Sequence, residues 1–419
     1  MRKVEDRVLG ALSPEYLLDC LDELVAIPGL SGGETPVQEA VAGRMREIGL
    51  GTDVWEIDFE TLRRHPAYTA EIERDSGLGV VGSVGRGDGP TLILNGHVDV
   101  VEAGEPDRWT SPPFEARVRG GRVYGRGTCD MKGGLCCALA VARAIADAGV
   151  DLQGTLQLQS VIGEEDGGAG TLATLVRGHT GQGAIVLEPT GLAIGPAHGG
   201  ALGFRVTVPG LAAHGAFREE GVSPIEPFGR LVAALRELEV ERNRDVSDPL
   251  FAEDALPFAL AIGRVRSGIW ASTVPESLQF EGRLGFPPGE APEDARRAFE
   301  AALSSASAHD PWLARNPPVV EWSGAQFGAA RTDPASEVVR TLEAAFGEVT
   351  QTVPQVRGMR YGSDMRLLVA VGGIPTVHFG PGDVRDAHRP DENVVIEELV
   401  TAARVVAVAA LRFCGVAGG

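Results

Sequence analysis

The sequence predicts an α/β protein in which a mostly parallel sheet is interrupted by an inserted ferredoxin-like α+β domain. From about residue 13 to residue 200, helical and strand-like segments alternate, which is the pattern of a parallel sheet covered by helices. After Gly195 the order of segments changes to β-α-β-β-α-β, which is typical of a ferredoxin-like fold. An apolar strand near the C-terminus has the character of the first-half strands, and we expect it to complete their sheet.

The elements of the first half follow from their hydrophobic spacing. Apolar residues recur at helical spacing in three segments and form nearly continuous apolar runs in three others. The predicted helices span residues 14–26, 35–48 and 134–148, and the predicted strands span residues 91–98, 155–162 and 184–187. Each of these strands ends at acidic residues or at a histidine, so the chemistry-bearing side chains gather at the ends of strands.

The second half begins with an alternating, half-exposed strand and a long amphipathic helix. Its predicted strands span residues 202–208, 258–265, 277–284 and 318–322, and its helices span residues 223–243 and 290–303. The last part returns to a helix, a strand at residues 374–379 and a helix at residues 394–413. Because 419 residues exceed what one hydrophobic core usually serves, we predict a main domain at residues 1–197 and 325–419 and an inserted domain at residues 198–324.

Composition and charge exclude several classes of protein. With 43% hydrophobic residues, 56 Gly and 27 Pro, the chain is globular rather than disordered or fibrous. The formal net charge of -20, without a basic patch, argues against nucleic acid or an anionic membrane as a partner. No apolar run approaches the roughly 18 residues that span a bilayer, the N-terminal segment lacks an apolar signal core, and the five scattered cysteines argue against a disulfide framework. We therefore expect a soluble cytoplasmic protein.

The run from Leu94 to Val100 carries His97 and Asp99 at the end of a predicted strand. Residues two apart on a strand share a face, so the imidazole and the carboxylate should project together. Such a pair is often a structural hydrogen bond. The downstream residues favour a different interpretation, in which His97 is a metal ligand and Asp99 is the carboxylate that orients it.

Further acidic residues and a second histidine follow other predicted strands or Gly-rich loops. They are Asp130, Glu164, Glu165, Glu188 and His388. Open α/β sheets place their ligand crevice at the carboxyl ends of strands, so we expect these side chains to converge with His97. Two imidazoles and three carboxylates can hold two divalent ions if one carboxylate bridges. Nitrogen and oxygen ligands without thiolate suit two Zn²⁺ ions, with Co²⁺ or Mn²⁺ as substitutes.

Five motifs resemble those of a known family of co-catalytic zinc hydrolases. They are LNGHVDVV, GRGTCDMKGG, GEEDGG, LEPT and AHRPDE, in the order in which the family has them and over nearly the whole chain. The family includes acetylornithine deacetylase, succinyl-diaminopimelate desuccinylase, aminoacylase and carboxypeptidase G. The resemblance implies that the inserted domain serves as a lid and dimerisation domain, and that the chain forms a homodimer through it.

The resemblance also implies a role for each matched residue. The implied metal ligands are His97 and Glu188 on one zinc ion, Glu165 and His388 on the other, and Asp130 as the bridge. Asp99 is implied to orient His97, and Glu164 to act as general base. On an extended backbone, adjacent Glu164 and Glu165 point in different directions, so one can bind metal while the other faces the reacting water. The ions would lower the pKa of that water from about 16 toward about 7, and Glu164 would pass its proton to the departing amine.

Four further residues are candidates for contacting the substrate. In the family, a histidine placed like His214 stabilises the oxyanion of the tetrahedral intermediate, often across a dimer interface, whereas the alternative is a simple turn histidine. Arg283 could bind a substrate carboxylate bidentately or form a surface ion pair. Gly380 lies in a loop that resembles the family's loop beside the substrate head group. Many members carry Asn before Val-Ile-Pro, where this chain has Trp270 to Pro275, so Trp270 either lines the substrate pocket or lies in the core.

These expectations describe a di-zinc amidohydrolase that removes a small acyl group from an N-acylated small molecule. The form Trp-Ala-Ser-Thr-Val-Pro is closer to the acetylornithine deacetylase and formylaminopyrimidine deformylase branch, and we expect an N-acetyl amino acid such as N-acetylornithine as substrate. The alternatives are deformylation of an aminopyrimidine in thiamin salvage, hydrolysis of dipeptides or carboxy-terminal residues, and a metal-binding protein without catalysis. Glu164 argues against the last, because a site kept only for metal has no use for a non-ligating base.

Overall fold

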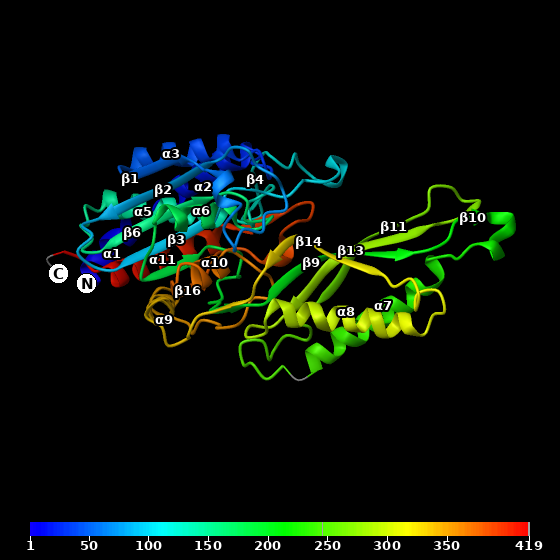
Figure 1. Cartoon of the computed structure of the whole chain (residues 1–419). Coiled ribbons are helices and arrows are strands. Elements are labelled where there is room, and N and C mark those ends of the chain that lie inside the picture. Colours follow the sequence, from blue (N-terminus) through cyan, green and yellow to red (C-terminus); the bar gives the residue numbers. More distant parts are fainter. Residues whose placement is uncertain (245, 418–419) are drawn as a thin grey trace. The chain divides into compact units, whose positions relative to one another are not determined.

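The computed structural model describes residues 1–244 and 246–417. The chain divides into two compact units. The large unit comprises Met1–Ala197, Arg331–Arg357 and Ser363–Gly419, and the inserted unit comprises His198–Ala330 and Gly358–Gly362. Figure 1 shows that the first and last parts of the chain, coloured blue and red, lie in the same unit.

The inserted unit ends later than the predicted boundary at residue 324. Strand β14 (Val319–Phe327) continues past that position and pairs with β9 (Gly200–Pro209) as far as Phe327, which lies opposite Ala201. The segment Gly358–Gly362 also belongs to this unit, since a Cβ on Gly358 would lie 2.2 Å from the ring of Phe251. A short segment that rejoins the inserted unit in this way has no periodic hydrophobic pattern that the sequence could reveal.

A six-stranded sheet forms the centre of the large unit and is mostly parallel, as predicted. Its order is β1-β2-β6-β3-β7-β16. The strands are β1 (Gly51–Glu56), β2 (Leu78–Gly85), β3 (Thr91–His97), β6 (Thr155–Val161), β7 (Gly183–Val186) and β16 (Thr376–His378). The pairings β6–β3, β3–β7 and β7–β16 are parallel, whereas β1 and β2 are antiparallel at one edge. The pairing of β16 with β7 confirms that the end of the chain completes the first sheet.

Helices cover both faces of this sheet (Figure 1). Helices α3, α5, α11 and α9 pack next to one another on one face, with α1 and α2 against α5, and α6 and α10 lie on the other face. Their bounds are α1 (Arg2–Ala11), α2 (Pro14–Ala26), α3 (Thr35–Ile48), α4 (Phe59–Leu62), α5 (Lys132–Asp147), α6 (Ala169–Arg177), α9 (Glu337–Thr350), α10 (Met365–Ala370) and α11 (Ile396–Cys414). In the part of the chain that the structure describes, no helix has the length and apolar character needed to cross a membrane.

Two glycines of the GRGTCDMKGG motif let the start of α5 pack closely, Gly134 against the segment after β7 and Gly133 against the loop before the helix. A Cβ on Gly134 would lie 2.1 Å from the carbonyl oxygen of Leu187, and one on Gly133 would lie 2.4 Å from that of Thr128. Both distances are far below van der Waals contact, so only glycine fits. The first turn of α5 therefore packs directly against the backbone that leads to Glu188.

A three-stranded antiparallel sheet joins two distant loops. Its order is β17 (Asn393–Val395), β5 (Arg122–Tyr124) and β4 (Arg117–Arg119). Strand β5 leads into the loop of Asp130, and β17 follows the loop of His388. The pairing of β5 with β17 brings these two loops together, although they are separated by more than half of the sequence.

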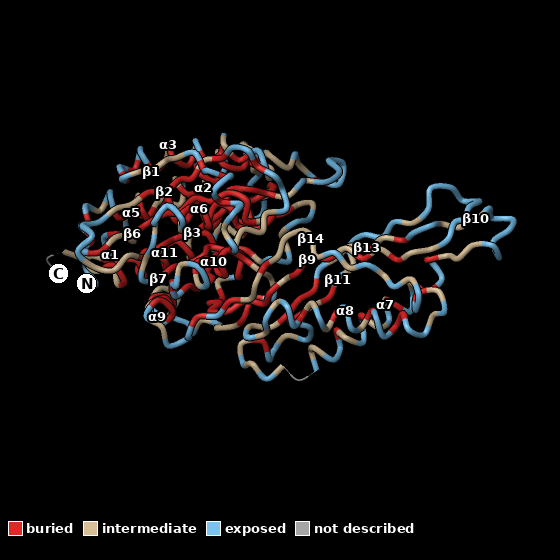
Figure 2. The backbone as a smooth tube through the Cα atoms, viewed as in Figure 1, coloured by how far each residue is buried: buried red, intermediate tan, exposed pale blue. Residues whose placement is uncertain are grey.

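The inserted unit has the predicted β-α-β-β-α-β order. Besides β9 and β14, its elements are α7 (Ile225–Arg244), β11 (Leu260–Ser267), β13 (Ser277–Phe286) and α8 (Pro292–Ala308). The sheet order β11-β13-β9-β14 confirms the ferredoxin-like arrangement. Its core includes Phe204, Phe280 and Phe299, with the rings of Phe204 and Phe299 4.6 Å apart. A small antiparallel pair, β10 (Ala213–His214) and β12 (Thr273–Val274), lies in a largely exposed segment (Figure 2).

Candidate metal centre

The site is built at the carboxyl ends of three adjacent strands of the large sheet. His97 is the last residue of β3, Glu164 and Glu165 follow β6, and Glu188 follows β7. Strands β6 and β7 flank β3, so their ends meet at one edge, where an open α/β sheet binds ligands. His97, Glu164 and Glu188 are buried. The predicted convergence at this edge is therefore present.

Asp130 and His388 join the cluster from the two loops that the small sheet brings together. The Oδ1 atom of Asp130 lies 3.2 Å from Nε2 of His97, and its Oδ2 atom lies 3.2 Å from Nε2 of His388. His388 has a φ of 60°, a left-handed backbone conformation that is uncommon for a residue with a side chain and is often found at functional sites. Asp130 thus offers one carboxylate oxygen to each imidazole.

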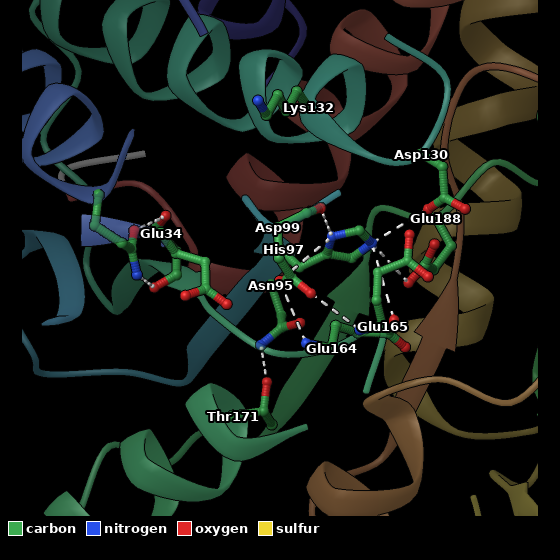
Figure 3. Close-up of polar contacts among 12 residues, drawn as sticks. Glu34, Asn95, His97, Asp99, Asp130, Lys132, Glu164, Glu165, Thr171 and Glu188 are labelled. Carbon is green, nitrogen blue, oxygen red and sulfur yellow. Dashed lines mark hydrogen bonds and ion pairs between the residues drawn. The ribbon is translucent and has the colours of Figure 1, made fainter. Parts of the chain in front are cut away.

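The remaining carboxylates divide between the two imidazoles, and Figure 3 shows those that lie around His97. Glu165 Oε1 lies 3.0 Å from His388 Nε2. Glu188 Oε1 and Glu164 Oε2 each lie 4.0 Å from His97 Nε2. Among the residues that the structure describes, two triplets could hold a metal ion, His97 with Glu164 and Glu188, and His97 with Asp130 and Glu165. The arrangement fits two ions with Asp130 between them, whereas the assignment of Glu164 as base rather than ligand stays a prediction.

Asp99 has a different contact from the one predicted. Nδ1 of His97 lies 2.9 Å from the main-chain carbonyl oxygen of Asp99, while the nearest carboxylate oxygen of Asp99 is 3.7 Å away. The Asp99 carboxylate instead accepts the backbone N–H groups of Glu164, at 3.3 Å, and Glu165, at 3.0 Å. Asp99 therefore orients His97 through its backbone and anchors the two glutamates through its side chain.

The expected extended backbone at Glu164 and Glu165 is wrong. Residues 164–167 form a turn closed by a hydrogen bond from the N–H of Gly167 to the carbonyl oxygen of Glu164, at 3.1 Å. The two side chains still face different imidazoles, Glu164 toward His97 and Glu165 toward His388. The separation of their roles is therefore compatible with the geometry, although its cause is the turn rather than strand alternation.

The electrostatics of the cluster favour a bound cation. Burial raises the pKa values of Glu164, Glu165 and Glu188, and neighbouring carboxylates raise them further. Burial alone would also raise the pKa of Asp130, but hydrogen bonds from His388 and His97 outweigh it and lower that pKa. Burial opposes the protonation of His388, yet its bonds to Asp130 and Glu165 raise its pKa to about 11. Without metal, bound protons must neutralise part of the negative charge of these carboxylates. Divalent ions would neutralise the same negative charge.

Glu392 braces the Asp130 loop and was not among the predicted site residues. Its Oε1 accepts the N–H groups of Cys129 and Asp130, at 3.0 and 3.1 Å, and its Oε2 accepts Nη1 of Arg126, at 2.6 Å. Glu392 is fully buried and ends the AHRPDE motif, four residues after His388. Its place in that motif was the signal that could have found it.

Lys132 lies close to the cluster in sequence but has another role. Its ammonium donates to the carbonyl oxygens of Leu24, Ile27 and Pro28, at 2.8, 2.8 and 3.1 Å. Figure 3 shows the side chain directed away from the acidic cluster. Burial lowers its pKa to about 7. Lys132 therefore holds the loop after α2 and does not contribute to the centre directly.

The predicted substrate-contacting residues are distributed over both units. Gly380, in the large unit, packs on the backbone before and at Glu188, since a Cβ there would lie 2.5 Å from the Glu188 carbonyl oxygen. His214, Trp270 and Arg283 lie in the inserted unit. His214 is exposed and its Nδ1 accepts the N–H of the residue two positions later, at 3.2 Å. Trp270 is 71% exposed, so the core interpretation of this residue is wrong.

Arg283 is exposed on β13 and donates to the carbonyl oxygen of Arg360, at 3.4 Å, within the inserted unit. Only the Nη2 atom of Arg283 takes part in this hydrogen bond. Binding of a substrate carboxylate by Arg283 stays a prediction, as do the roles of His214 and Trp270.

The α/β sheet, the ferredoxin-like insertion and the cluster of imidazoles and carboxylates, which is buried around His97 and exposed at His388, define a hydrolase of the metal-dependent class. Residues 93–412 match the model of peptidase family M20/M25/M40, and the chain belongs to this family. This confirms the resemblance drawn from the motifs and the expectation of an amidohydrolase.

Relatives of the chain include enzymes with different acyl specificities. It is 30% identical over 387 residues to N-formyl-4-amino-5-aminomethyl-2-methylpyrimidine deformylase of Bacillus subtilis, covering 88% of this chain and 87% of the relative. It is 31% identical over 405 residues to acetylornithine deacetylase of Myxococcus xanthus, covering 94% and 97%. Among solved structures, the YXEP protein of Bacillus subtilis, a dinuclear metal-binding peptidase of the M20 family, superposes with a TM-score of 0.60 at 18% identity, covering 96% of this chain and 98% of that one.

Proposed function

We propose that this chain is a dinuclear zinc amidohydrolase that removes a formyl or acetyl group from an amine of a small molecule. The observation that carries the proposal is the position of Asp130, with one carboxylate oxygen 3.2 Å from each of two imidazoles. The donors around it are nitrogen and oxygen atoms without thiolate, which suits zinc, with cobalt or manganese as substitutes. The dinuclear nature of the YXEP neighbour supports the same stoichiometry.

Bound divalent ions supply Lewis acidity, which polarises a carbonyl oxygen and lowers the pKa of water from about 16 toward about 7. The protein supplies the proton transfer. Glu164 is buried, and burial together with Glu188 raises the pKa of its carboxyl group well above the ordinary value. A carboxyl group tuned in this way can take a proton from the attacking water and return it to the amine that leaves. Asp99 keeps Glu164 in place by accepting its backbone N–H.

Two acyl groups are supported by particular relatives. The deformylase and deacetylase relatives both align with most of this chain, and each carries the name of one acyl group. We propose a small N-acylated amine as substrate, either an N-formylaminopyrimidine or an N-acetyl amino acid such as N-acetylornithine. We also propose a homodimer formed through the inserted unit, in which His214 stabilises the oxyanion of the intermediate.

The proposal is tested by metal analysis coupled to a panel of substrates. The purified chain should bind about two zinc ions and hydrolyse either the N-formylaminopyrimidine or N-acetylornithine faster than N-succinyl-diaminopimelate or simple dipeptides. Removal of zinc with a chelator should abolish turnover, and added zinc should restore it. A preference for dipeptides would replace the deacylase proposal with a peptidase. A chain that binds two ions and hydrolyses none of the panel would contradict it.

A further inference from the structure

A segment between α4 and β2, residues 68–74, is fastened to the turn that carries Glu164 and Glu165. We call this segment the strap. The N–H of Glu71 donates to the carbonyl oxygen of Asp166, and the N–H of Ile72 donates to its carboxylate Oδ2, both at 2.8 Å. A Cβ on Gly167 would lie 2.6 Å from the carbonyl oxygen of Thr69, so backbone packs on backbone there. The strap has no regular secondary structure, and its place depends on these contacts.

Arg74, the last residue of the strap, is a buried cation with two carboxylate partners. Its side chain is 1% exposed. Nη1 donates to Oδ2 of Asp166 at 2.8 Å, and Nη2 and Nε donate to Oε1 of Glu34 at 2.5 and 3.1 Å. The guanidinium also lies against Gly163, where a Cβ would be 3.1 Å from Cζ of Arg74. One side chain thus joins the residue before α3, the strap and the turn after β6.

The turn is held from three directions. Asp99 accepts the N–H groups of Glu164 and Glu165, Arg74 holds the side chain of Asp166, and Arg366 donates from Nη2 to the carbonyl oxygen of Gly167 at 2.7 Å. Each residue of the turn thus has a hydrogen bond to a buried side chain. Such support of the groups around a metal ligand commonly sets its affinity and reactivity.

We propose that Arg74 is a positioning residue for the metal centre. By holding Asp166 it fixes the turn in the course that directs Glu164 toward His97 and Glu165 toward His388. This inference rests on the ligand set given under the proposed function. It assigns a role to a residue outside the matched family model, which begins at residue 93, and to a segment without any of the five motifs.

The alternative is that Arg74 forms an ion pair that contributes to stability alone. The two interpretations differ in what they predict for metal. If Arg74 contributes to stability alone, its replacement should lower the unfolding temperature and leave zinc affinity and turnover of the folded protein unchanged. If Arg74 positions the turn, its replacement should loosen the turn in the folded protein and weaken zinc binding at the ligand next to Asp166.

The test compares Arg74→Lys and Arg74→Met with wild type and with Arg177→Lys as a matched control. Lysine keeps the charge but lacks the fork that reaches Asp166 and Glu34 from separate nitrogen atoms. Arg177 pairs with Asp53 in an exposed position of the same unit. Hydrogen exchange of the metal-free proteins, zinc affinity by chelator competition, and kcat at saturating zinc are measured for each.

We expect faster exchange in peptides covering residues 68–74 and 163–168 for both Arg74 variants, and no change for Arg177→Lys. Zinc affinity should fall by roughly 10-fold in Arg74→Lys and by up to about 100-fold in Arg74→Met, with a lower kcat in both. If Arg74→Met does not fold, Arg74→Lys decides the question by the same criteria. Zinc affinity and kcat within about twofold of wild type in folded Arg74→Lys would overturn the inference and leave the proposed function standing. A wild-type chain that binds no zinc would instead overturn both.

Discussion

Asp130 places its two carboxylate oxygens at equal distances, 3.2 Å, from Nε2 of His97 and Nε2 of His388. The two imidazoles come from strand β3 and from a loop near the C-terminus, and no other side chain contacts both of them at this distance among the described residues. A carboxylate in this position can bridge two cations, which ties the occupancy of one position to that of the other.

Replacing Asp130 should therefore affect both metal positions. We expect Asp130→Ala to lose zinc at both and to reduce kcat/KM by more than the roughly 100-fold that removal of a supporting residue produces. Metal content by mass spectrometry and turnover on the preferred substrate measure the two effects. Asp88→Asn, in an exposed turn of the same unit, serves as control. Retention of one tightly bound zinc ion by Asp130→Ala would contradict the bridging role.

Glu164→Gln separates the proposed base from the ligands. The amide keeps the size of the side chain but cannot accept a proton, so kcat should fall by about 10²- to 10⁴-fold while two zinc ions remain bound. Glu60→Gln, an exposed residue of α4, should behave as wild type. Loss of one zinc ion in Glu164→Gln would instead assign Glu164 to the triplet with His97 and Glu188.

His214→Ala tests the role proposed for the inserted unit. His214 is exposed and belongs to the inserted unit, whereas the proposed ligands belong to the large unit, so its loss should leave zinc content and unfolding temperature unchanged. If it donates to the oxyanion, kcat should fall by about 10²- to 10³-fold. His309→Ala, another exposed histidine of that unit, is the matched control, and sedimentation checks that both variants keep the assembly of wild type. Normal turnover by His214→Ala would remove this residue from the mechanism.

Stability of the metal-free protein should decrease as pH rises from 5 to 7. The folded-state pKa values of Glu164 and Glu188 are raised by burial and by like charges, so the folded state keeps protons that the unfolded state releases above pH 4.5. His388, with a folded pKa of about 11, acts in the same direction above pH 6.5. Each proton bound only in the folded state lowers the free energy of unfolding by about 1.4 kcal/mol per pH unit.

The zinc-loaded protein should show the opposite dependence, because metal replaces those protons and binds more tightly as pH rises. Urea unfolding at pH 5, 6 and 7, with chelator or with zinc, measures both slopes. Equal slopes in the two conditions would mean that the cluster does not exchange protons for metal.

Gly134→Ala should disturb the metal centre through Leu187, the residue before Glu188. The added Cβ would lie 2.1 Å from the Leu187 carbonyl oxygen, so α5 or the segment before Glu188 must move. We expect a loss of about 1–3 kcal/mol in unfolding free energy and weaker zinc binding. Gly43→Ala, in α3, meets no atom within 4 Å and should be neutral or stabilising by about 0.5–1 kcal/mol. Unfolding and zinc titration of both variants provide the comparison.

The sequence predicted the parts of the site that follow regular elements. His97, Glu165 and Glu188 lie at the end of an apolar strand or within a few residues after it, and strand ends at one edge of a parallel sheet meet by geometry alone. Strands β1 and β2 were not predicted, because Gly residues and a half-exposed face break their alternation. The contacts of Asp99, Arg74 and Glu392 could not be predicted either, since each joins segments far apart in the sequence and depends on how loops pack.

The brace between Glu392 and the amide of Asp130 spans 262 positions, and His388 comes from the same late segment. During synthesis, four of the proposed ligands, from His97 to Glu188, therefore leave the ribosome long before Glu392 and His388 are made. The complete set of ligands is available only when translation approaches α11.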